Sequence, residues 1–321
     1  MFEDIPDVAS ADDLLDLSFK KAKKTQISDR NAFYRKKKTI IAKTQSFSTY
    51  IITRLERYVK KFPSIDKLPM FYQEILQIKI DIDKLKKSLG AVNWAYKTCK
   101  KIYMSQFKAL KKSKNIIFLQ KKQKEIQGRI SSVIKQIDKE LTLLSKAQQF
   151  LKKLPEIKDM PTIVIAGYPN VGKSSLLRCL SSAKPKIAEY PFTTKEIHLG
   201  HIKKTEHYHD KSFQIIDTPG LLDRSLSKRN NIEKQAIAAL THLADIIIFM
   251  FDPSETCGYP LKDQKNLLMH MKKMFKKSIF VTVENKSDVK KTTLKNLKIS
   301  CETKEGIDQL IEQLFLEYKE K

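Results

Sequence analysis

The stretch TIVIAGYPNVGKSSLL, residues 162–177, decides the fold of the second half of the chain. It passes from a short apolar run at Thr162–Ala166 into a glycine-containing loop and then into a helical pattern. The loop at 167–174 has the form GxxxxGKS, in which glycines let backbone N–H groups wrap around phosphate oxygens. The positive end of the following helix adds further donors. The order strand, loop and helix therefore predicts a phosphate-binding loop.

Two side chains of this loop have predicted chemical roles. Lys173 can reach the β- and γ-phosphates of a nucleotide, and the Ser174 hydroxyl can bind Mg²⁺. The remaining loop residues expected in the nucleotide site are Gly167, Tyr168, Pro169, Asn170, Val171, Gly172 and Ser175.

Two downstream segments fit the same site. In DTPG at 217–220, Asp217 can hold Mg²⁺ through a water, and the Gly220 N–H can bond the γ-phosphate. Between the loop and DTPG, a threonine next to Phe192 can be a second protein ligand of Mg²⁺, ordered only while γ-phosphate is present. The chemistry alone leaves Thr193 and Thr194 as alternatives for that ligand.

Guanine selectivity is predicted from NKSD at 285–288, which follows an apolar run. The Asp288 carboxylate can accept from guanine N1 and N2 together, and adenine lacks that pair of donors. Asn285 is expected to brace the loops, and the aliphatic part of Lys286 to cover the base. Ser300 and Cys301 follow the next apolar run, and we expect their backbone N–H groups to bond guanine O6.

Short apolar runs alternate with helical patterns throughout 161–321, which indicates a mostly parallel sheet covered on both faces. We therefore predict a P-loop α/β domain over 161–321. Its expected strands are 162–166, 196–202, 213–216, 246–251, 278–284 and 298–300, with a last helix at 306–319.

The first half of the chain differs in its glycine and proline content and in its apolar spacing. Only Gly90 and Gly128 precede residue 160, and no proline occurs between Pro69 and Pro155, so the span reads as helical. Ile126, Ile130, Val133, Ile137, Leu141 and Leu144 recur at steps of three and four, as on one helix face. Two more long helices are expected at 71–89 and 92–110, around Gly90. The sequence thus predicts an all-α bundle over 1–160. We expect Trp94 in its core, although its ring could instead stack on splayed nucleic-acid bases.

Positive charge is concentrated in that half. The 321 residues carry 62 Lys+Arg and 36 Asp+Glu, a net charge of +26. Residues 1–160 have 36 basic and 17 acidic residues, or +19, and 161–321 have 26 and 19, or +7. The first half is therefore the expected polyanion-binding half, with basic runs at 20–24 and 35–38, and with Phe33 and Tyr34 available to stack on RNA bases.

Other classes are disfavoured by composition. No run of about 18 apolar residues is present, and the acidic start lacks the pattern of a secretory signal, so we expect no membrane association. The four cysteines are far apart and form no CxxC pair, which argues against a zinc site and favours a reducing compartment.

The motifs GYPNVGKSSLL, SSAKPKIAEYPFTTKEIHLGH, DTPGLLDR and NKSD resemble the Obg-like GTPases, and within them the Nog subfamily. The stretches IPDVASADDLLDLSFKKAKKT, RNAFYRKKK and LKKLPEI resemble the Nog N-terminal domain. The resemblance implies GTP and GDP as ligands with Mg²⁺, and it makes Thr194 the Mg²⁺ threonine. It implies catalytic roles for Lys173, Asn170, Thr194 and Gly220. Asn170 has two open interpretations, a K⁺-binding residue or a turn residue.

One departure concerns catalysis. Leu221 follows DTPG where Ras-like proteins have a water-positioning glutamine, so we expect slow intrinsic hydrolysis. The chain also ends soon after the GTPase pattern, as in short archaeal relatives. We expect a monomeric, cytoplasmic GTPase (nucleolar in a eukaryote) that acts with large-subunit rRNA, the ribosomal particle or assembly factors. The alternatives are a structural RNA-binding factor with GTP rarely hydrolysed, or a general Obg-like translational GTPase.

Overall fold

The structure, a computed structural model, describes residues 2–158, 160–189, 196–206, 209–223, 229, 231–293 and 295–319. It contains two compact units. The helical unit comprises Met1–Leu68 and Lys79–Lys152, and the sheet unit comprises Pro69–Ile78 and Lys153–Lys321. The predicted fold class, a helical bundle followed by a P-loop domain with a mostly parallel sheet, is confirmed.

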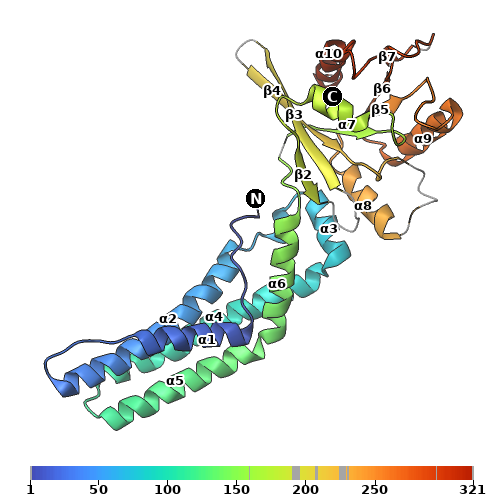
Figure 1. Ribbon diagram of the computed structural model, residues 1–321. Helices are drawn as coiled ribbons and strands as arrows, with labels where there is room; N and C mark the ends of the chain where they lie inside the picture. Colours follow the sequence, from blue (N-terminus) through green and yellow to red (C-terminus); the bar gives the residue numbers. More distant parts are fainter. Residues whose placement is uncertain are drawn as a thin grey trace. The chain divides into compact units, whose positions relative to one another are not determined.

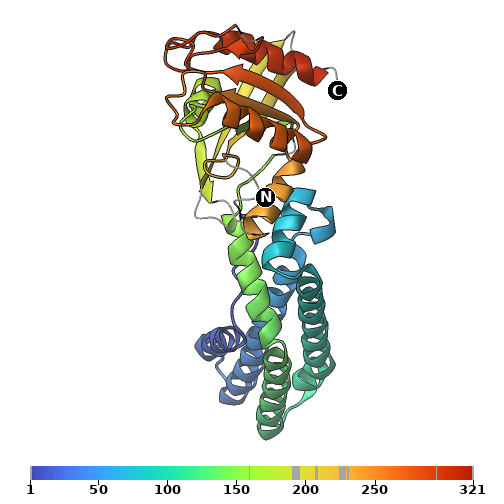
Figure 2. The same cartoon turned by 90° about the vertical axis from the view of Figure 1, so that its right-hand side faces the viewer.

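The helical unit is built from long amphipathic helices (Figures 1 and 2). Side-chain caps begin four of the described helices. The capping residues are Ser10, Asn31, Asp81 and Asn115, and each accepts from a backbone N–H of the first turn that follows it. Their apolar faces, including Phe47 at 0% exposure, form the core. The helices are α1 (Ala11–Lys24), α2 (Ala32–Lys61), the short η1 (Ile65–Lys67), α4 (Ile82–Lys112), α5 (Ile116–Gln136) and α6 (Asp138–Lys153).

Three expectations for this half were wrong in detail. No helix boundary occurs at Gly90: α4 runs through it, and the break lies at Ile80–Asp81, where Asp81 accepts from two N–H groups of the next turn. The stripe at 126–144 is buried as expected but belongs to two helices, α5 and α6, which meet at Ile137. Trp94 is 48% exposed and is not a core residue, because α4 turns that position outward.

Helix α3 (Met70–Lys79) lies within the range 1–160 yet belongs to the sheet unit. Tyr72 is fully buried, and its hydroxyl donates to the Pro155 carbonyl (2.8 Å) and accepts from the Ile157 N–H (2.8 Å). At the exposed side of α3, Glu74 lies 2.8 Å from His242. The compact units therefore do not follow a single cut near residue 160.

The sheet has the strand order β2-β3-β4-β1-β5-β6-β7. Strands β4, β1, β5, β6 and β7 are mutually parallel, and β2 and β3 are antiparallel to their neighbours. The strands are β1 (Thr162–Ala166), β2 (Lys186–Glu189), β3 (Glu196–Glu206), β4 (His209–Asp217), β5 (Ile246–Phe251), β6 (Ile279–Glu284) and β7 (Leu297–Lys298).

Predictions for the buried strands were the most accurate. The bounds of β1 and β5 are those expected, since both strands are buried along their full length and read as continuous apolar runs. The expectation missed β2, a short strand at the edge of the sheet, whose Ile187 is 64% exposed. It also made β3 and β4 too short, because their outer halves carry polar side chains.

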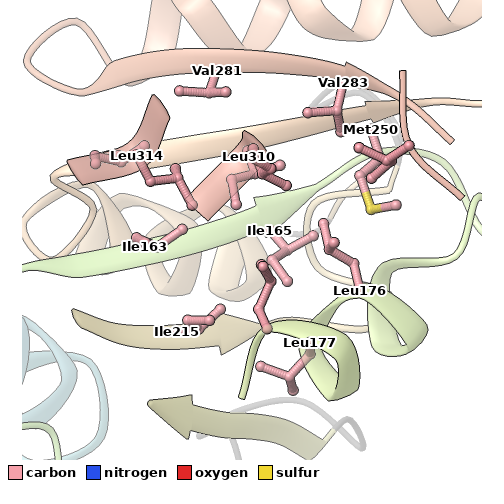
Figure 3. Packing of buried hydrophobic residues seen from close by; sticks show 14 of the residues in the cluster. Ile163, Ile165, Leu176, Leu177, Ile215, Met250, Val281, Val283, Leu310 and Leu314 are labelled. Carbon is pink, nitrogen blue, oxygen red and sulfur yellow. The ribbon is translucent and has the colours of Figure 1, made fainter. Parts of the chain in front are cut away.

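Helices cover both faces of this sheet. Helix α7 (Lys173–Leu180) and α10 (Ile307–Lys319) bury one face, where Leu177 and Leu310 pack with Ile163 and Ile165 (Figure 3). Helices α8 (Asn231–Thr241) and α9 (Leu261–Met274) lie over the other face (Figure 1). The loops that follow the parallel strands therefore emerge together at one edge, where ligands of such sheets bind. None of the described helices is long and apolar enough to cross a membrane.

Candidate nucleotide-binding site

The loop at 167–174 requires glycine at two positions. Gly167 has φ +139°, and a Cβ there would lie 2.7 Å from the Met250 carbonyl oxygen. Gly172 has φ +103°, and its Cβ would lie 2.2 Å from Asn285 Nδ2. Any side chain would be strained by the backbone angle and would displace a neighbour. The tight path of the loop thus depends on both glycines.

Donors of this loop are available to a ligand. Within the described residues, the N–H groups of Asn170, Val171 and Gly172 have no protein acceptor. They lie just before the positive end of α7. The hollow beside them has a volume of about 440 Å³ and is also lined by Pro219, Gly220 and Asp223. The arrangement suits phosphate oxygens.

Lys173 lies inside the loop. Its ammonium group donates to the carbonyl oxygens of Gly167 (2.9 Å) and Tyr168 (2.7 Å). Burial lowers the pKa of Lys173, while the negative charge of Asp217 opposes that effect. Among the described residues, this cation has two neutral carbonyl partners and no ion-pair partner at hydrogen-bonding distance, so it can move to an incoming phosphate.

Ser174 and Asp217, the two described residues expected to hold Mg²⁺, lie in contact. The Ser174 hydroxyl donates to Asp217 Oδ2 at 2.5 Å, and the second carboxylate oxygen, Oδ1, is buried with no hydrogen-bond partner among the residues that the structure describes. Burial raises the pKa of Asp217, while the Ser174 hydrogen bond and the charge of Lys173 lower it. His198 Nδ1 lies 3.7 Å away.

These oxygens fit Mg²⁺. The ion prefers hard oxygen ligands and is bound through one or two carboxylates with substrate phosphates rather than by an all-protein cage. An orphaned, fully buried carboxylate oxygen next to a hydroxyl is such a donor set. The described residues contain no cluster of three or more His, Cys, Asp or Glu side chains that could hold a metal.

Asn285 braces two loops, as expected. Its side-chain N–H donates to the Val171 carbonyl (2.8 Å), and its carbonyl accepts from the Cys301 N–H (3.1 Å). A cleft of about 940 Å³ opens beside it. Its lining includes the loop, the NKSD segment, the segment after β7 and the start of α10, for example Gly172, Lys286, Asp288, Ser300 and Ile307.

Asp288 has the properties that base recognition needs. Its side chain is exposed and lines this cleft, and it forms no hydrogen bond or ion pair with the described residues. The carboxylate is therefore free to accept two hydrogen bonds at once.

Lys286 is fixed by its own partners. Its ammonium group donates to Asp252 (2.6 Å) and to the Thr256 hydroxyl (2.7 Å), which leaves the aliphatic part along the cleft. Burial raises the pKa of Asp252, but the hydrogen bonds from Lys286, Ser254 and Thr256 outweigh it, so the pKa lies below its ordinary value. Asp252 and Thr256 were not predicted from the sequence. An aspartate at the end of the buried strand β5 was the available signal.

The predicted bonds from the Ser300 and Cys301 N–H groups to guanine O6 stay a prediction, and both groups have partners within the protein. The Ser300 N–H donates to the Glu305 carbonyl (3.0 Å), and the Cys301 N–H donates to Asn285. Both N–H groups are thus engaged within the protein. A bond from Cys301 to guanine O6 would have to replace or share the bond to Asn285.

Of the remaining predicted residues, Phe192, Thr193 and Thr194 lie outside the described residues. Gly220 lines the phosphate hollow with φ +75°, and Leu221 is 1% exposed. Sequence reasoning missed Arg229, a buried side chain that donates to the Gly220 carbonyl (3.3 Å) and lies 3.4 Å from Asp223.

Comparison with known families fits this geometry. Residues 2–158 match the model of the NOG1 N-terminal helical domain, and residues 162–286 match the model of the 50S ribosome-binding GTPase. An uncharacterized protein of Methanocaldococcus jannaschii is 43% identical over 77% of this chain and 68% of its own length. The chain belongs to the Nog family of GTPases. It is therefore a GTP-binding protein with a P-loop GTPase domain.

Eukaryotic members of the family are longer. Nucleolar GTP-binding protein 1 of Kluyveromyces lactis is 31% identical over 97% of this chain, but the chain spans only 48% of that protein. A crystal structure of nucleolar GTP-binding protein 1 from Plasmodium falciparum is 32% identical and covers 52% of this chain and 97% of its own, with a TM-score of 0.41.

Proposed function

We propose that this Nog-family chain is a GTP-dependent factor that acts on the large ribosomal subunit or its precursor during assembly. The observation that carries the guanine-nucleotide part is the unpartnered Asp288 carboxylate in a cleft continuous with the glycine loop. The description of the matched GTPase family as 50S ribosome-binding supports the ribosomal part. The excess charge of +19 on residues 1–160 supports contact with rRNA.

In the proposed mechanism, the loop N–H groups and Lys173 hold the phosphates. The two carbonyl bonds of Lys173 keep its ammonium group aimed along the loop until a phosphate replaces them. Ser174 and Asp217 would hold Mg²⁺, which neutralises charge on the β- and γ-phosphates. Thr194 is proposed as the ligand that reports the γ-phosphate, because the resemblance to Obg-like proteins assigns it that role. The Gly220 N–H would donate to the same phosphate.

Slow hydrolysis is proposed for the isolated chain. Leu221 is buried and apolar, so it cannot orient an attacking water by hydrogen bonding. The same observation favours a second candidate function, a structural RNA-binding factor in which bound GTP is rarely hydrolysed. A general translational GTPase acting on mature ribosomes has no such observation in its favour.

Single-turnover hydrolysis separates the two candidates. The purified chain is loaded with radiolabelled GTP and mixed with large subunits, small subunits or buffer. An assembly GTPase should hydrolyse faster with large subunits and no faster with small subunits. Equal rates in all three mixtures, with GTP retained on the particle, would support the structural factor instead.

A K⁺ ion is proposed as part of this activation, held by the Asn170 side chain. Asn170 is exposed and lines both the phosphate hollow and the guanine cleft, and its φ of +62° lies in the left-handed region. Asn170→Gly tolerates that backbone and removes the amide oxygen, whereas Asn170→Asp keeps an oxygen. We expect K⁺ in place of Na⁺ to accelerate the parent and the Asp variant but not the Gly variant. No response in the parent would leave Asn170 as a turn residue.

Location and assembly state follow from the proposed role. We propose a monomer that binds large-subunit rRNA together with assembly factors, in the cytoplasm or, in a eukaryote, in the nucleolus. Analytical ultracentrifugation of the free chain tests the first point, and fractionation of tagged cells tests the second.

A further inference from the structure

A groove of about 580 Å³ lies between α1 and α2 of the helical unit, and it includes Lys21 of the basic run at 20–24. One wall is a stripe of α2 residues whose sequence positions are alternately three and one apart. The other wall is formed by the end of α1, including Lys21. The α2 residues are Ala42, Gln45, Ser46, Thr49, Tyr50, Thr53, Arg54 and Arg57, and Thr25 completes the α1 side. At 1.5 Å per residue the stripe is about 22 Å long.

This stripe is separate from the core-facing side of α2. The buried positions, among them Phe47, Ile51 and Leu55, lie on the neighbouring face and hold the helix in the bundle. The groove face instead carries hydroxyls, an amide and cations. Such donors would be costly in an apolar core, and on this face they are available to a polar ligand.

Three cations line the groove, and no carboxylate does. Lys21, Arg54 and Arg57 form no ion pair within the described residues. Two carboxylates of this unit form ion pairs with other lysines: Asp7 binds Lys152 at 2.8 Å, although the charge of Arg54 also acts on it, and Glu56 binds Lys60 at 2.7 Å.

An aromatic ring positions two of the cations. Lys21 Nζ lies 5.3 Å from the centre of the Tyr50 ring, and the Arg54 guanidinium lies 5.5 Å from it. Tyr50 thus brings together charges from two helices that would otherwise repel each other. Keeping like charges adjacent and unpaired is favourable once an anion lies between them.

We propose that this groove binds the phosphodiester backbone of an RNA strand. The inference rests on the proposed ribosomal function, and it assigns the RNA contact to the groove between α1 and α2. Arginine forks and hydroxyl donors are the groups that proteins aim at phosphates, and a stripe along a helix matches a ligand whose charges repeat along its length. The basic run at 35–38 offers less, because its side chains point around the helix and Lys38 is already paired with Asp29 at 2.6 Å.

The test compares two variants of the full chain with the same change of charge. The groove variant is Lys21→Gln, Arg54→Gln, Arg57→Gln, and the matched control is Arg35→Gln, Lys36→Gln, Lys37→Gln. The probe is single-stranded polyuridylate, titrated over a range of salt concentrations. Three lost phosphate contacts should flatten the slope of log K against log salt by about 2 and weaken binding about 100-fold at 0.1 M salt. The control should lose much less.

Further variants guard against a folding artefact. Tyr50→Leu keeps all charges but removes the ring, so binding should weaken about fivefold, and Tyr50→Phe should restore it. Arg57→Gln alone changes one exposed side chain and should still flatten the slope by about 0.7. GTP affinity should not change in any of them, since the nucleotide site lies in the sheet unit.

The outcomes that overturn the proposal are distinct. Equal losses in groove variant and control would mean diffuse attraction and no site, and the RNA-binding function would survive. Displacement of RNA by polyglutamate as strongly as by unlabelled polyuridylate would assign the groove to an acidic protein. No binding of any RNA by the unaltered chain at low salt would remove the RNA part of the proposed function together with this inference.

Discussion

The two units use positive charge in opposite ways. In the sheet unit, Lys173 and Lys286 each have two short hydrogen bonds to defined partners, and both are at least partly buried. In the helical unit, Lys21, Arg54 and Arg57 surround an open groove without a carboxylate partner. The first arrangement fixes a cation for one chemical task, whereas the second leaves cations available to a large anion.

The difference teaches where single substitutions should matter. A lysine placed by loop carbonyls contributes through geometry, so its loss should affect one ligand strongly. Cations on a groove contribute through the number of phosphates neutralised, so their losses should add and should depend on salt.

Lys173→Ala should have the largest effect. It removes the ammonium group from the loop, and loss of one pre-positioned electrostatic contact costs about 100- to 1,000-fold in turnover. Single-turnover GTP hydrolysis in the presence of large subunits measures it. Lys262→Ala, an exposed lysine at the start of α9, is the matched control and should hydrolyse GTP at the parental rate. A loss of less than about tenfold for Lys173→Ala would contradict the assignment.

Asp288→Asn should be next in size. The amide presents a donor where guanine N1 and N2 need an acceptor, and loss of such a charged hydrogen-bond pair costs about 1.5–3 kcal/mol, or roughly ten- to 150-fold in GTP affinity. Calorimetric titration of GTP and xanthosine triphosphate checks it, because xanthine carries an oxygen that the new amide can bond. The exposed neighbour substitution Val289→Ala serves as control. Unchanged selectivity for GTP would refute the role of Asp288.

Residues in the nucleotide site were largely predictable because each follows a buried strand in a short, fixed order. Gly167, Ser174 and Asp217 take positions that sheet register imposes, since Ile165 pairs with Asp217 across β1 and β4. The hydrogen bond from the Cys301 N–H to Asn285 was not predictable, because it depends on the packing of the loop after β6 against the loop after β7. Asp252 was missed for the same reason: its role appears only through Lys286.

In the helical unit the sequence predicted helices but not their ends. Gly90 looked like a boundary, yet tertiary packing offsets the roughly 1 kcal/mol that glycine costs in a helix, and the Asp81 cap sets the true start. The groove was only partly predictable, because Lys21 belongs to the basic run at 20–24, whereas Arg54 and Arg57 join it only through the packing of α1 on α2. The membership of α3 in the sheet unit likewise depends on the Tyr72 contacts.

The substitution Tyr72→Phe tests whether α3 belongs to the sheet unit. The variant leaves the Pro155 carbonyl and the Ile157 N–H without their buried partner, at a cost of about 1–3 kcal/mol. The unfolding transition to follow is the one that GDP shifts upward, since GDP stabilises only the unit that binds it. Tyr103→Phe, in the helical unit, should leave that transition unchanged. An effect of Tyr72→Phe on the GDP-insensitive transition alone would place α3 with the helical unit.

The pH dependence of stability at alkaline pH is a second test of the burial of Tyr72. Burial raises the pKa of Tyr72 from 10.0 to about 12. As the pH rises, the unfolded chain therefore releases the phenolic proton first. The contribution of Tyr72 to the free energy of unfolding is complete below pH 10 and is lost as the pH rises towards about 12. A two-unit shift corresponds to about 2.7 kcal/mol. The stability difference between the parent and Tyr72→Phe should shrink over this window. A difference independent of pH would mean that Tyr72 is not buried as described.

The smallest predicted effect concerns the pair Glu74–His242, which joins α3 to the end of α8 in the sheet unit. Both side chains are more than a third exposed, so solvent screens the interaction and its expected coupling is about 0.2–1 kcal/mol. A double-mutant cycle with Glu74→Gln and His242→Gln, measured on the GDP-sensitive transition, isolates it. High salt should reduce the coupling towards zero, whereas the cost of Tyr72→Phe should persist. A coupling above about 2 kcal/mol, or one that resists salt, would show that α3 is held by charge and not by the buried tyrosine.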